Sequence, residues 1–229
     1  MKFAPLIEKI TTVSNEVQLR SCFLEYAGEL VGASAWGLDL LDSRFQVIRS
    51  DCWGLPDTFR DRYEEIGRNV DQVSQQMIQY QIPVHTLSIQ SLQDWYQSEL
   101  YQSVFRIYGI EHAMVAPLIG SGRLLGGIYF MRGKELPAFN DGDLIQLSSL
   151  CQHLSVRLAT FRLVITPSLA NCLTPREVDV AELVAQGFSN REIALKLYIS
   201  RDAVKQLLKR MFQKLNVSTR AEMVGKLKG

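Results

Sequence analysis

The segment that decides the fold is LTPREVDVAELVAQGFSNREIALKLYISRDAVKQLLKRMFQKLNVSTRA, residues 173–221. It contains three capping boxes, in which a Ser or Thr is followed three residues later by Glu, and they begin at Thr174, Ser189 and Thr219. Each box opens a short segment with apolar residues at helical spacing, and Ser200 opens a further one. Three such boxes within one short segment are hard to obtain by chance. The segment therefore predicts four helices.

Two of these helices have the spacing of a helix-turn-helix. The helix from Asn190 and the helix from Ser200 are joined by a turn near Tyr198 and Ile199. In that arrangement the second helix lies in the major groove of DNA. The sequence therefore predicts that the helix from Ser200 reads bases.

The second helix has a basic polar face. Lys205 and Lys209 stand one turn apart with Gln206 beside them. Lys can donate to guanine O6 and N7, and Gln can bind adenine with two hydrogen bonds. Residues 173–229 carry a net charge of +5, whereas the rest of the chain carries −4. This asymmetry favours a polyanionic partner at one end of the chain, the alternative being ordinary solvated helix faces.

The same segment resembles the LuxR/FixJ-type helix-turn-helix. The family motifs LTxRE, QG-x-SN-x-EIA, L-x-IS, VK, KL-x-V and R-A occur in order and at the family spacing. The resemblance implies a sequence-specific transcription regulator that binds an inverted DNA repeat as a homodimer. It implies base contacts from Lys205, Gln206 and Lys209, and phosphate contacts from Arg191, Ser200, Arg201 and Arg210. Ala203 and Leu207 depart from the family, which usually has Thr and His there.

The preceding residues have a different pattern. Helical spacing occurs over 15–30, 56–66, 70–80, 91–108 and 141–163, and β-favouring runs occur at 36–41, 45–49, 112–119 and 124–132. Paired strands with helices segregated around them predict an antiparallel sheet in an α/β/α sandwich, so the whole chain is of the α+β class. We expect a sensory domain over residues 1–163, a linker over 164–172 and an all-α domain over 173–229.

Residues 1–163 resemble, diffusely, the autoinducer-binding domain of the quorum-sensing LuxR branch, and a GAF-like sensory domain fits almost as well. The resemblance implies a small-molecule pocket between sheet and helices. The candidate ligand-binding residues are Phe59, Tyr63, Asp71, His85 and Ala113. Simple packing of Phe59 and Tyr63 in the core, and capping of a helix by Asp71, are alternatives at these positions.

The candidate pocket departs from the family at several positions. Phe59 stands where a family Trp donates to the lactone carbonyl, and Phe has no donor. A buried carbonyl left unpaired costs about 1–3 kcal/mol. Gln72 replaces a Pro, His85 or Thr86 replaces a Trp, and Ala113 replaces a Gly. We therefore expect a ligand other than an acyl-homoserine lactone, or a degenerate pocket that works without ligand or through a protein partner.

Other classes of protein are disfavoured. A phospho-receiver needs paired acids after its first strand, and the sequence has none there. No G-x-S-x-G, H-E-x-x-H or P-loop motif is present, so we expect neither an enzyme nor a cofactor. The four cysteines have no metal-binding spacing. The N-terminus is not a secretory signal, and residues 120–123 interrupt the most apolar stretch, so we expect a cytoplasmic protein without membrane contact.

Overall fold

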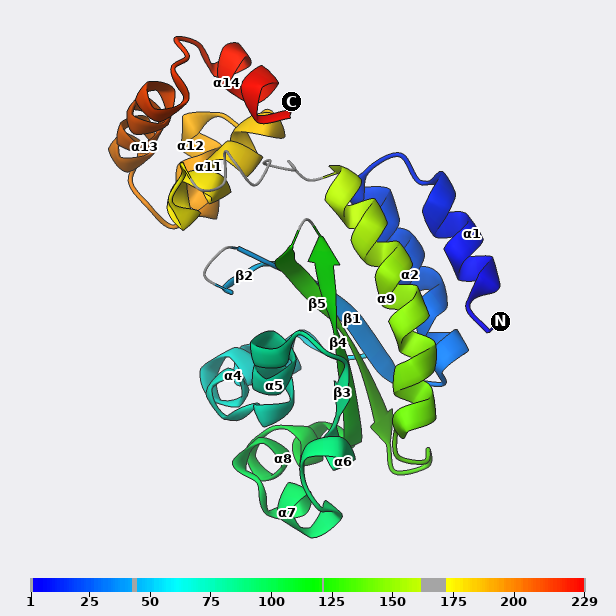
Figure 1. The fold of residues 1–229 in the computed structure, drawn as a ribbon. Helices are drawn as coiled ribbons and strands as arrows, with labels where there is room; N and C mark the ends of the chain where they lie inside the picture. Colours follow the sequence, from blue (N-terminus) through cyan, green and yellow to red (C-terminus); the bar gives the residue numbers. More distant parts are fainter. Residues whose placement is uncertain (1, 43–44, 121, 162–171, 229) are drawn as a thin grey trace. The chain divides into compact units, whose positions relative to one another are not determined.

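The computed structural model describes residues 2–42, 45–120, 122–161 and 172–228. The chain divides into two compact units (Figure 1). The first consists of Met1–Leu40 and Arg49–Leu158, and the second of Leu41–Ile48 and Ala159–Gly229. The fold is of the predicted α+β class, with an antiparallel sheet in the first unit and a bundle of helices in the second.

The first unit is organised around a five-stranded sheet in the order β2-β1-β5-β4-β3. The strands are β1 (Ala35–Leu41), β2 (Val47–Trp53), β3 (Val84–His85), β4 (Ile110–Gly120) and β5 (Arg123–Gly133). The pairs β1–β5, β4–β5 and β3–β4 are antiparallel. The strand order places β2 beside β1 and β4 beside β5, so the two predicted strand pairs are confirmed. The sequence pattern missed β3, because two residues are too short to show a period.

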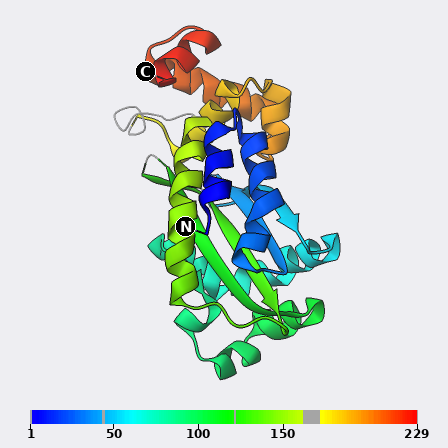
Figure 2. The same cartoon turned by 90° about the vertical axis from the view of Figure 1, so that its right-hand side faces the viewer.

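Three helices cover one face of the sheet, and Figures 1 and 2 show them together from two sides. They are α1 (Ala4–Thr12), α2 (Glu16–Val31) and α9 (Asp141–Phe161). Phe23 of α2 packs edge-on against Phe130 of β5, and Trp36 Nε1 donates to the Leu24 carbonyl at 2.9 Å. Gly28 allows this close approach, since a Cβ there would lie 2.1 Å from the Trp36 ring.

The opposite face carries a series of short helices. They are α3 (Asp57–Arg62), η1 (Tyr63–Gly67), α4 (Arg68–Val70), α5 (Gln72–Tyr80), α6 (Thr86–Ile89), α7 (Leu92–Gln97), α8 (Glu99–Ser103) and η2 (Phe105–Tyr108). The helix expected over 70–80 is present as α5, which begins two residues later, whereas the expectation of one unbroken helix over 91–108 is wrong, and local caps explain both differences. The Asp71 side chain accepts from Ser74 N, and the Ser98 side chain accepts from Tyr101 N. Each cap has extended backbone and starts a new helix.

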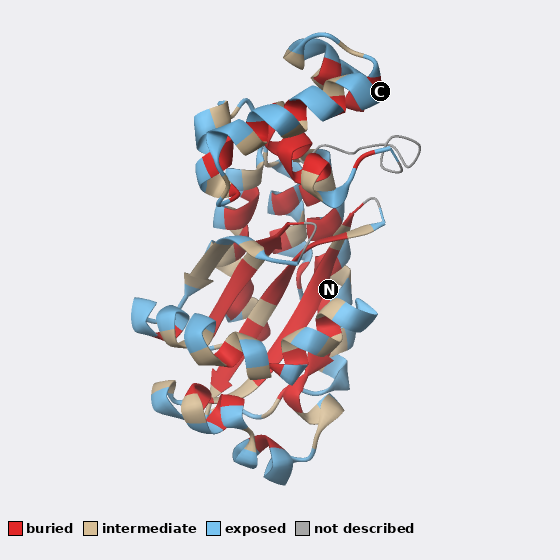
Figure 3. Ribbon diagram, turned by 90° about the vertical axis from the view of Figure 1, so that its left-hand side faces the viewer, coloured by how far each residue is buried: buried red, intermediate tan, exposed pale blue. Residues whose placement is uncertain are grey.

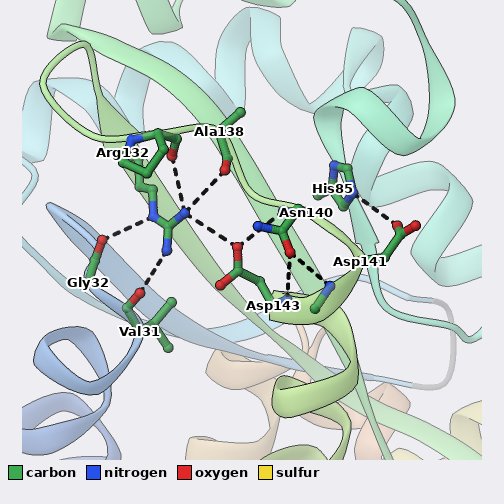
Figure 4. A network of polar contacts seen from close by, with 10 residues as sticks. Val31, Gly32, His85, Arg132, Ala138, Asn140, Asp141 and Asp143 are labelled. Carbon is green, nitrogen blue, oxygen red and sulfur yellow. Dashed lines mark hydrogen bonds and ion pairs between the residues drawn. The ribbon is translucent and has the colours of Figure 1, made fainter.

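Arg132 of β5 joins the end of α2 to the loop before α9 (Figure 4). Its Nη2 donates to the Val31 carbonyl at 2.8 Å and its Nε to the Gly32 carbonyl at 3.0 Å. Its Nη1 donates to the Pro137 carbonyl at 3.1 Å and lies 3.4 Å from Asp143 Oδ2. A residue that is only 7% exposed is thus satisfied from several elements at once.

The second unit contains four helices, as predicted. They are α11 (Pro175–Ala185), α12 (Asn190–Lys196), α13 (Arg201–Leu215) and α14 (Arg220–Lys228). The capping boxes at Thr174 and Ser189 are present, and Gly187 has the expected positive φ of 88°. Thr219 Oγ1 accepts from Glu222 N at 3.1 Å and so caps the last helix, and the Glu222 side chain accepts from Ser218 N at 2.8 Å. The buried side chains form one core through all four helices. In the ribbon of Figure 3 the buried residues are coloured red.

The end of the predicted helix at Leu163 and most of the predicted linker lie outside the described residues. No helix in the described ranges combines the length and apolarity needed to cross a bilayer. Within those same ranges, His, Cys, Asp and Glu side chains form no group of three that could bind a metal ion.

Candidate DNA-binding and ligand-binding sites

Helix α13 has a sharp division between a buried and an exposed face. Its buried residues are Val204, Leu208, Met211 and Leu215. Its exposed residues include Arg201, Lys205, Gln206, Lys209 and Arg210. The period of an α-helix places these two sets on opposite sides. The structure therefore gathers the predicted base-reading side chains on one solvent-facing surface.

The N-terminus of α13 and the turn before it have the local geometry that the sequence predicts. Ser200 Oγ accepts from Ala203 N at 3.0 Å, so the hydroxyl caps the helix while the residue stays exposed. Tyr198 has φ of 52° in the turn between α12 and α13. Arg191 is exposed in the first turn of α12. Lys205 Nζ pairs with Asp202 Oδ1 at 3.0 Å, and this exposed pair is too weak to withhold Lys205 from a polyanion.

An open groove of about 530 Å³ runs along α13 beside the start of α12. Lys205, Lys209 and Gln213 line it, and each lies one helical turn from the next. Asn190 of α12 lines it as well. The sequence pattern assigned no role to Asn190 or Gln213. The spacing of four residues from Lys209 to Gln213 is the signal that could have identified Gln213.

In the first unit, the structure brings Phe59, Tyr63 and Asp71 together. The Phe59 and Tyr63 rings stack with centroids 5.9 Å apart. The Tyr63 hydroxyl donates to Asp71 Oδ2 at 2.6 Å. Asp71 Oδ1 accepts from Ser74 N at 3.0 Å, and its Oδ2 also accepts from Ser74 Oγ at 2.6 Å. Asp71 is therefore the cap of α5 and is already satisfied by the protein.

The contact with Asp71 also fixes the protonation state of Tyr63. Burial, followed by the charge and hydrogen bond of Asp71, raises the pKa of the Tyr63 hydroxyl well above its usual value. A neutral phenol donating to an ionised carboxylate is the arrangement that this shift favours. Both side chains thus stabilise each other.

Ala113 and His85 lie on different faces of the sheet. Ala113 is buried in the same hydrophobic cluster as Phe59. His85 pairs in register with Met114, the next residue along β4, and its Nε2 lies 3.4 Å from Asp141 Oδ1 at the start of α9 (Figure 4). Neighbouring residues of a strand point to opposite faces. The structure therefore does not bring His85 together with Phe59, Tyr63 and Asp71.

A polar cluster that the sequence reasoning missed lies on the face covered by the short helices. It consists of Asp39 of β1, Ser50 and Cys52 of β2, and Tyr129 of β5. The Ser50 side chain is hydrogen-bonded to Asp39, and the Tyr129 hydroxyl is hydrogen-bonded to the Cys52 thiol. Burial raises the pKa of Asp39 to about 6, whereas Ser50 and the charges of Arg68 and Arg60 oppose the rise. The signal in the sequence is a charged residue inside the apolar run AWGLDLL.

Asp39→Asn is expected to stabilise the protein above pH 7, by about 1–3 kcal/mol. The pKa of Asp39 is about 6 in the folded state, above the value near 3.9 of an unfolded chain. The folded state therefore holds the proton more tightly, and stability falls as the pH rises from about 4 to about 6. Asn carries no charge, so the stability of the variant does not fall with pH in this way. Urea unfolding at pH 4.5 and pH 7.5 measures the difference.

The control for this prediction is Asp61→Asn, which removes one carboxylate from an exposed position of α3. It should change the stability little at either pH. Equal stability of the wild type and Asp39→Asn at pH 7.5 would contradict the expectation. That result would mean that the Asp39 carboxylate is solvated or paired in solution, with the exposed Arg60 as one candidate partner.

Comparison with known proteins assigns a family to each part of the chain. The GAF domain model matches residues 15–158. The model for bacterial regulatory proteins of the luxR family matches residues 171–226. The nitrate/nitrite response regulator NarL of Escherichia coli is 36% identical over 81 residues, which are 35% of this chain and 37% of that protein. ComA of Bacillus subtilis is 44% identical over 52 residues, which are 23% of this chain and 24% of that protein.

Solved structures share the fold at low sequence identity. Escherichia coli SdiA has a TM-score of 0.53 and 18% identity, covering 97% of this chain and 93% of that one. CepR2 of Burkholderia cenocepacia, an N-acylhomoserine lactone dependent LuxR family transcription factor, has a TM-score of 0.50 and 12% identity, covering 70% and 93%. Against NarL and ComA, this chain spans well under half of the relative's length. The chain belongs to the GAF domain family over residues 15–158, and it ends in a domain of the luxR family of bacterial regulatory proteins.

Proposed function

We propose that this chain is a sequence-specific DNA-binding transcription regulator whose N-terminal part senses a small molecule. The observation that carries the proposal is the exposed basic face of α13 in a luxR-family helix-turn-helix. Lys205, Gln206 and Lys209 contact base edges in the major groove. Arg191, Ser200, Arg201 and Arg210 contact phosphates, which position the helix without reading sequence.

The sensory part of the proposal is supported by the fold. One solved structure of SdiA is a complex with octanoyl-rac-glycerol, and CepR2 is described as dependent on an N-acylhomoserine lactone. In this chain, Phe59 offers no donor to a lactone carbonyl, and Asp71 is already occupied by Tyr63 and Ser74. We therefore propose a ligand that is not an acyl-homoserine lactone.

A degenerate pocket is the second candidate, and the packing of aromatic rings favours it. The Phe59 ring contacts those of Tyr63, Phe105 and Tyr108, with centroids 5.3 to 6.1 Å apart. Such a cluster is stable without a ligand. In this alternative the regulator acts without ligand or through a protein partner.

We propose a sensory domain over residues 1–163, a linker over 164–172 and a DNA-binding domain over 173–229, in a cytoplasmic protein that binds and does not catalyse.

We also propose that it binds an inverted repeat as a homodimer. Ile145 and Val156 of α9 are 73% and 60% exposed and lie about three helical turns apart, so α9 is the first candidate dimer surface. The last helix, α14, is the second candidate dimer surface.

Selection of bound duplexes from random DNA by the full chain tests this function. We expect the selected sequences to share an inverted repeat, and sedimentation of the complex to give two protomers per duplex, because one recognition helix buries little surface. No enrichment of any sequence would refute DNA reading. A single protomer on one half-site would refute the dimer and leave DNA reading in place.

A further inference from the structure

Asp39 lies on β1, on the sheet face that the short helices cover. Gly37, two residues before it, faces the Tyr129 hydroxyl, and a Cβ there would lie 2.2 Å from that oxygen. Asp39 pairs in register with Gly127 of β5. Gly127 has no side chain, and the nearest atom above it is the terminal methyl of Met77, 2.9 Å from where a Cβ would stand. Beside the Asp39 carboxylate, the sheet surface therefore consists of backbone atoms that are covered by the flexible side chain of Met77.

One oxygen of Asp39 has no partner. Asp39 Oδ1 is shielded from solvent and accepts no hydrogen bond from any described residue. The neighbouring donors are engaged elsewhere: Tyr129 is bonded to Cys52, and Arg68 donates to Glu64 through Nε, at 2.6 Å, and through Nη2. A shielded carboxylate oxygen without a donor loses the hydration that it would have in water. A ligand that donates a hydrogen bond to this oxygen would compensate for the lost hydration.

We propose that Asp39 anchors a small molecule that carries a protonated amine, bound over Gly127 with the Met77 side chain displaced. This inference rests on the proposed sensory function and specifies its ligand. A charged N–H donor forms the strongest hydrogen bond to a carboxylate. A lactone or ester carbonyl only accepts hydrogen bonds and would repel Asp39 Oδ1, and a neutral amide N–H or hydroxyl would form a weaker bond to it than a charged N–H donor.

The charges around Asp39 are compatible with a cation. Arg68 of α4 is paired with Glu64 of η1, which leaves little net charge from that pair. Arg60 of α3 is exposed, so water and salt screen it. Tyr129 and Cys52 are neutral at pH 7.5, because burial raises the pKa of both groups. A protonated amine bound here would therefore interact mainly with the carboxylate of Asp39.

Calorimetry of the full chain at pH 7.5 tests the proposal with phenethylamine, tyramine, cadaverine and spermidine as probes. The neutral isostere of phenethylamine, 2-phenylethanol, is the matched ligand control. We expect at least one amine to bind the wild type and to bind Asp39→Asn at least tenfold more weakly. We expect 2-phenylethanol to bind both proteins equally weakly. Asp61→Asn is the matched protein control and should bind as the wild type does.

A second variant tests the location independently of the charge. Gly127→Ala places a methyl group on the sheet surface where the amine is proposed to bind. It should weaken amine binding at least tenfold, although Asp39 is retained. Thermal melting of each variant establishes that it is folded. Equal amine affinity of the wild type and folded Asp39→Asn would overturn the anchor.

The outcomes separate this inference from the proposed function. No binding of any amine in the panel, with binding of N-octanoyl homoserine lactone or octanoyl glycerol unchanged in Asp39→Asn, would overturn the inference and leave the sensory function standing. No binding of any probe, with DNA binding intact, would overturn the inference and favour the degenerate pocket. Loss of DNA selection by the wild type would instead refute the proposed regulator.

Discussion

Replacing Lys205 and Lys209 together by alanine is expected to weaken binding to the selected DNA by about 2–6 kcal/mol, because each base-contacting side chain contributes about 1–3 kcal/mol. Both ammonium groups project from the exposed face of α13, and both line the groove beside α12. Their removal takes away base contacts and two positive charges from one surface. Fluorescence anisotropy at fixed salt measures the change in affinity.

The matched control is the double variant Lys2→Ala, Lys134→Ala, which removes the same charge from exposed positions of the first unit. It should retain wild-type affinity. Arg201→Ala should act differently, since loss of a phosphate contact weakens all sequences alike and lowers the slope of log affinity against log salt by about one. Wild-type affinity in Lys205→Ala, Lys209→Ala would show that another surface reads the DNA.

The C-terminal helices could be predicted closely because their limits are set locally. A Ser or Thr cap needs only the backbone N–H groups two or three residues later, and a left-handed stop needs only one glycine. Thr174, Ser189 and Gly187 all behave in this way. The residues next to each helix end therefore determine where these helices begin and end.

The N-terminal unit could be predicted only in outline. Its paired strands have clear alternation, but the helices between them are interrupted at residues that also look acceptable inside a helix. Asp71 is the helix cap that the sequence offered as an alternative to ligand binding, whereas Ser98 becomes a cap because the chain must turn over the sheet, which is a tertiary requirement. Helix α1 went unpredicted: its stability comes from burial of Leu6 and Ile10 against other elements, as is usual for short helices.

The candidate ligand site shows the same limit. The closeness of Tyr63 and Asp71 follows from a separation of eight residues along adjoining short helices. The cluster around Asp39 depends on the register of β1 against β5, which places Asp39 opposite Gly127. His85 depends on the pleat of β3, and a shift of one residue would have reversed its face. Register across strands that are distant in sequence cannot be read from local pattern.

The second large effect is expected from Arg132→Met, which should lower the free energy of unfolding by about 2–4 kcal/mol. Met extends about as far as the Nε of Arg and so preserves the buried stem, and the loss therefore reports on the guanidinium. Without it, the carbonyls of Val31 and Gly32 at the end of α2 lose their Arg132 donors, as does the Pro137 carbonyl. The Asp143 carboxylate loses its cation. Urea unfolding followed by circular dichroism measures the change.

Arg106→Met is the control, because Arg106 is exposed and its guanidinium donates to the side chain of Gln102, one turn earlier on the surface. It should change stability by less than about 0.5 kcal/mol. Arg132→Lys separates charge from geometry. An ammonium retains the charge beside Asp143, but unlike the planar guanidinium it cannot donate to carbonyls on two sides at once. We expect it to recover only part of the loss. Full recovery by Lys would show that the charge near Asp143 matters more than the bonds to Val31 and Gly32.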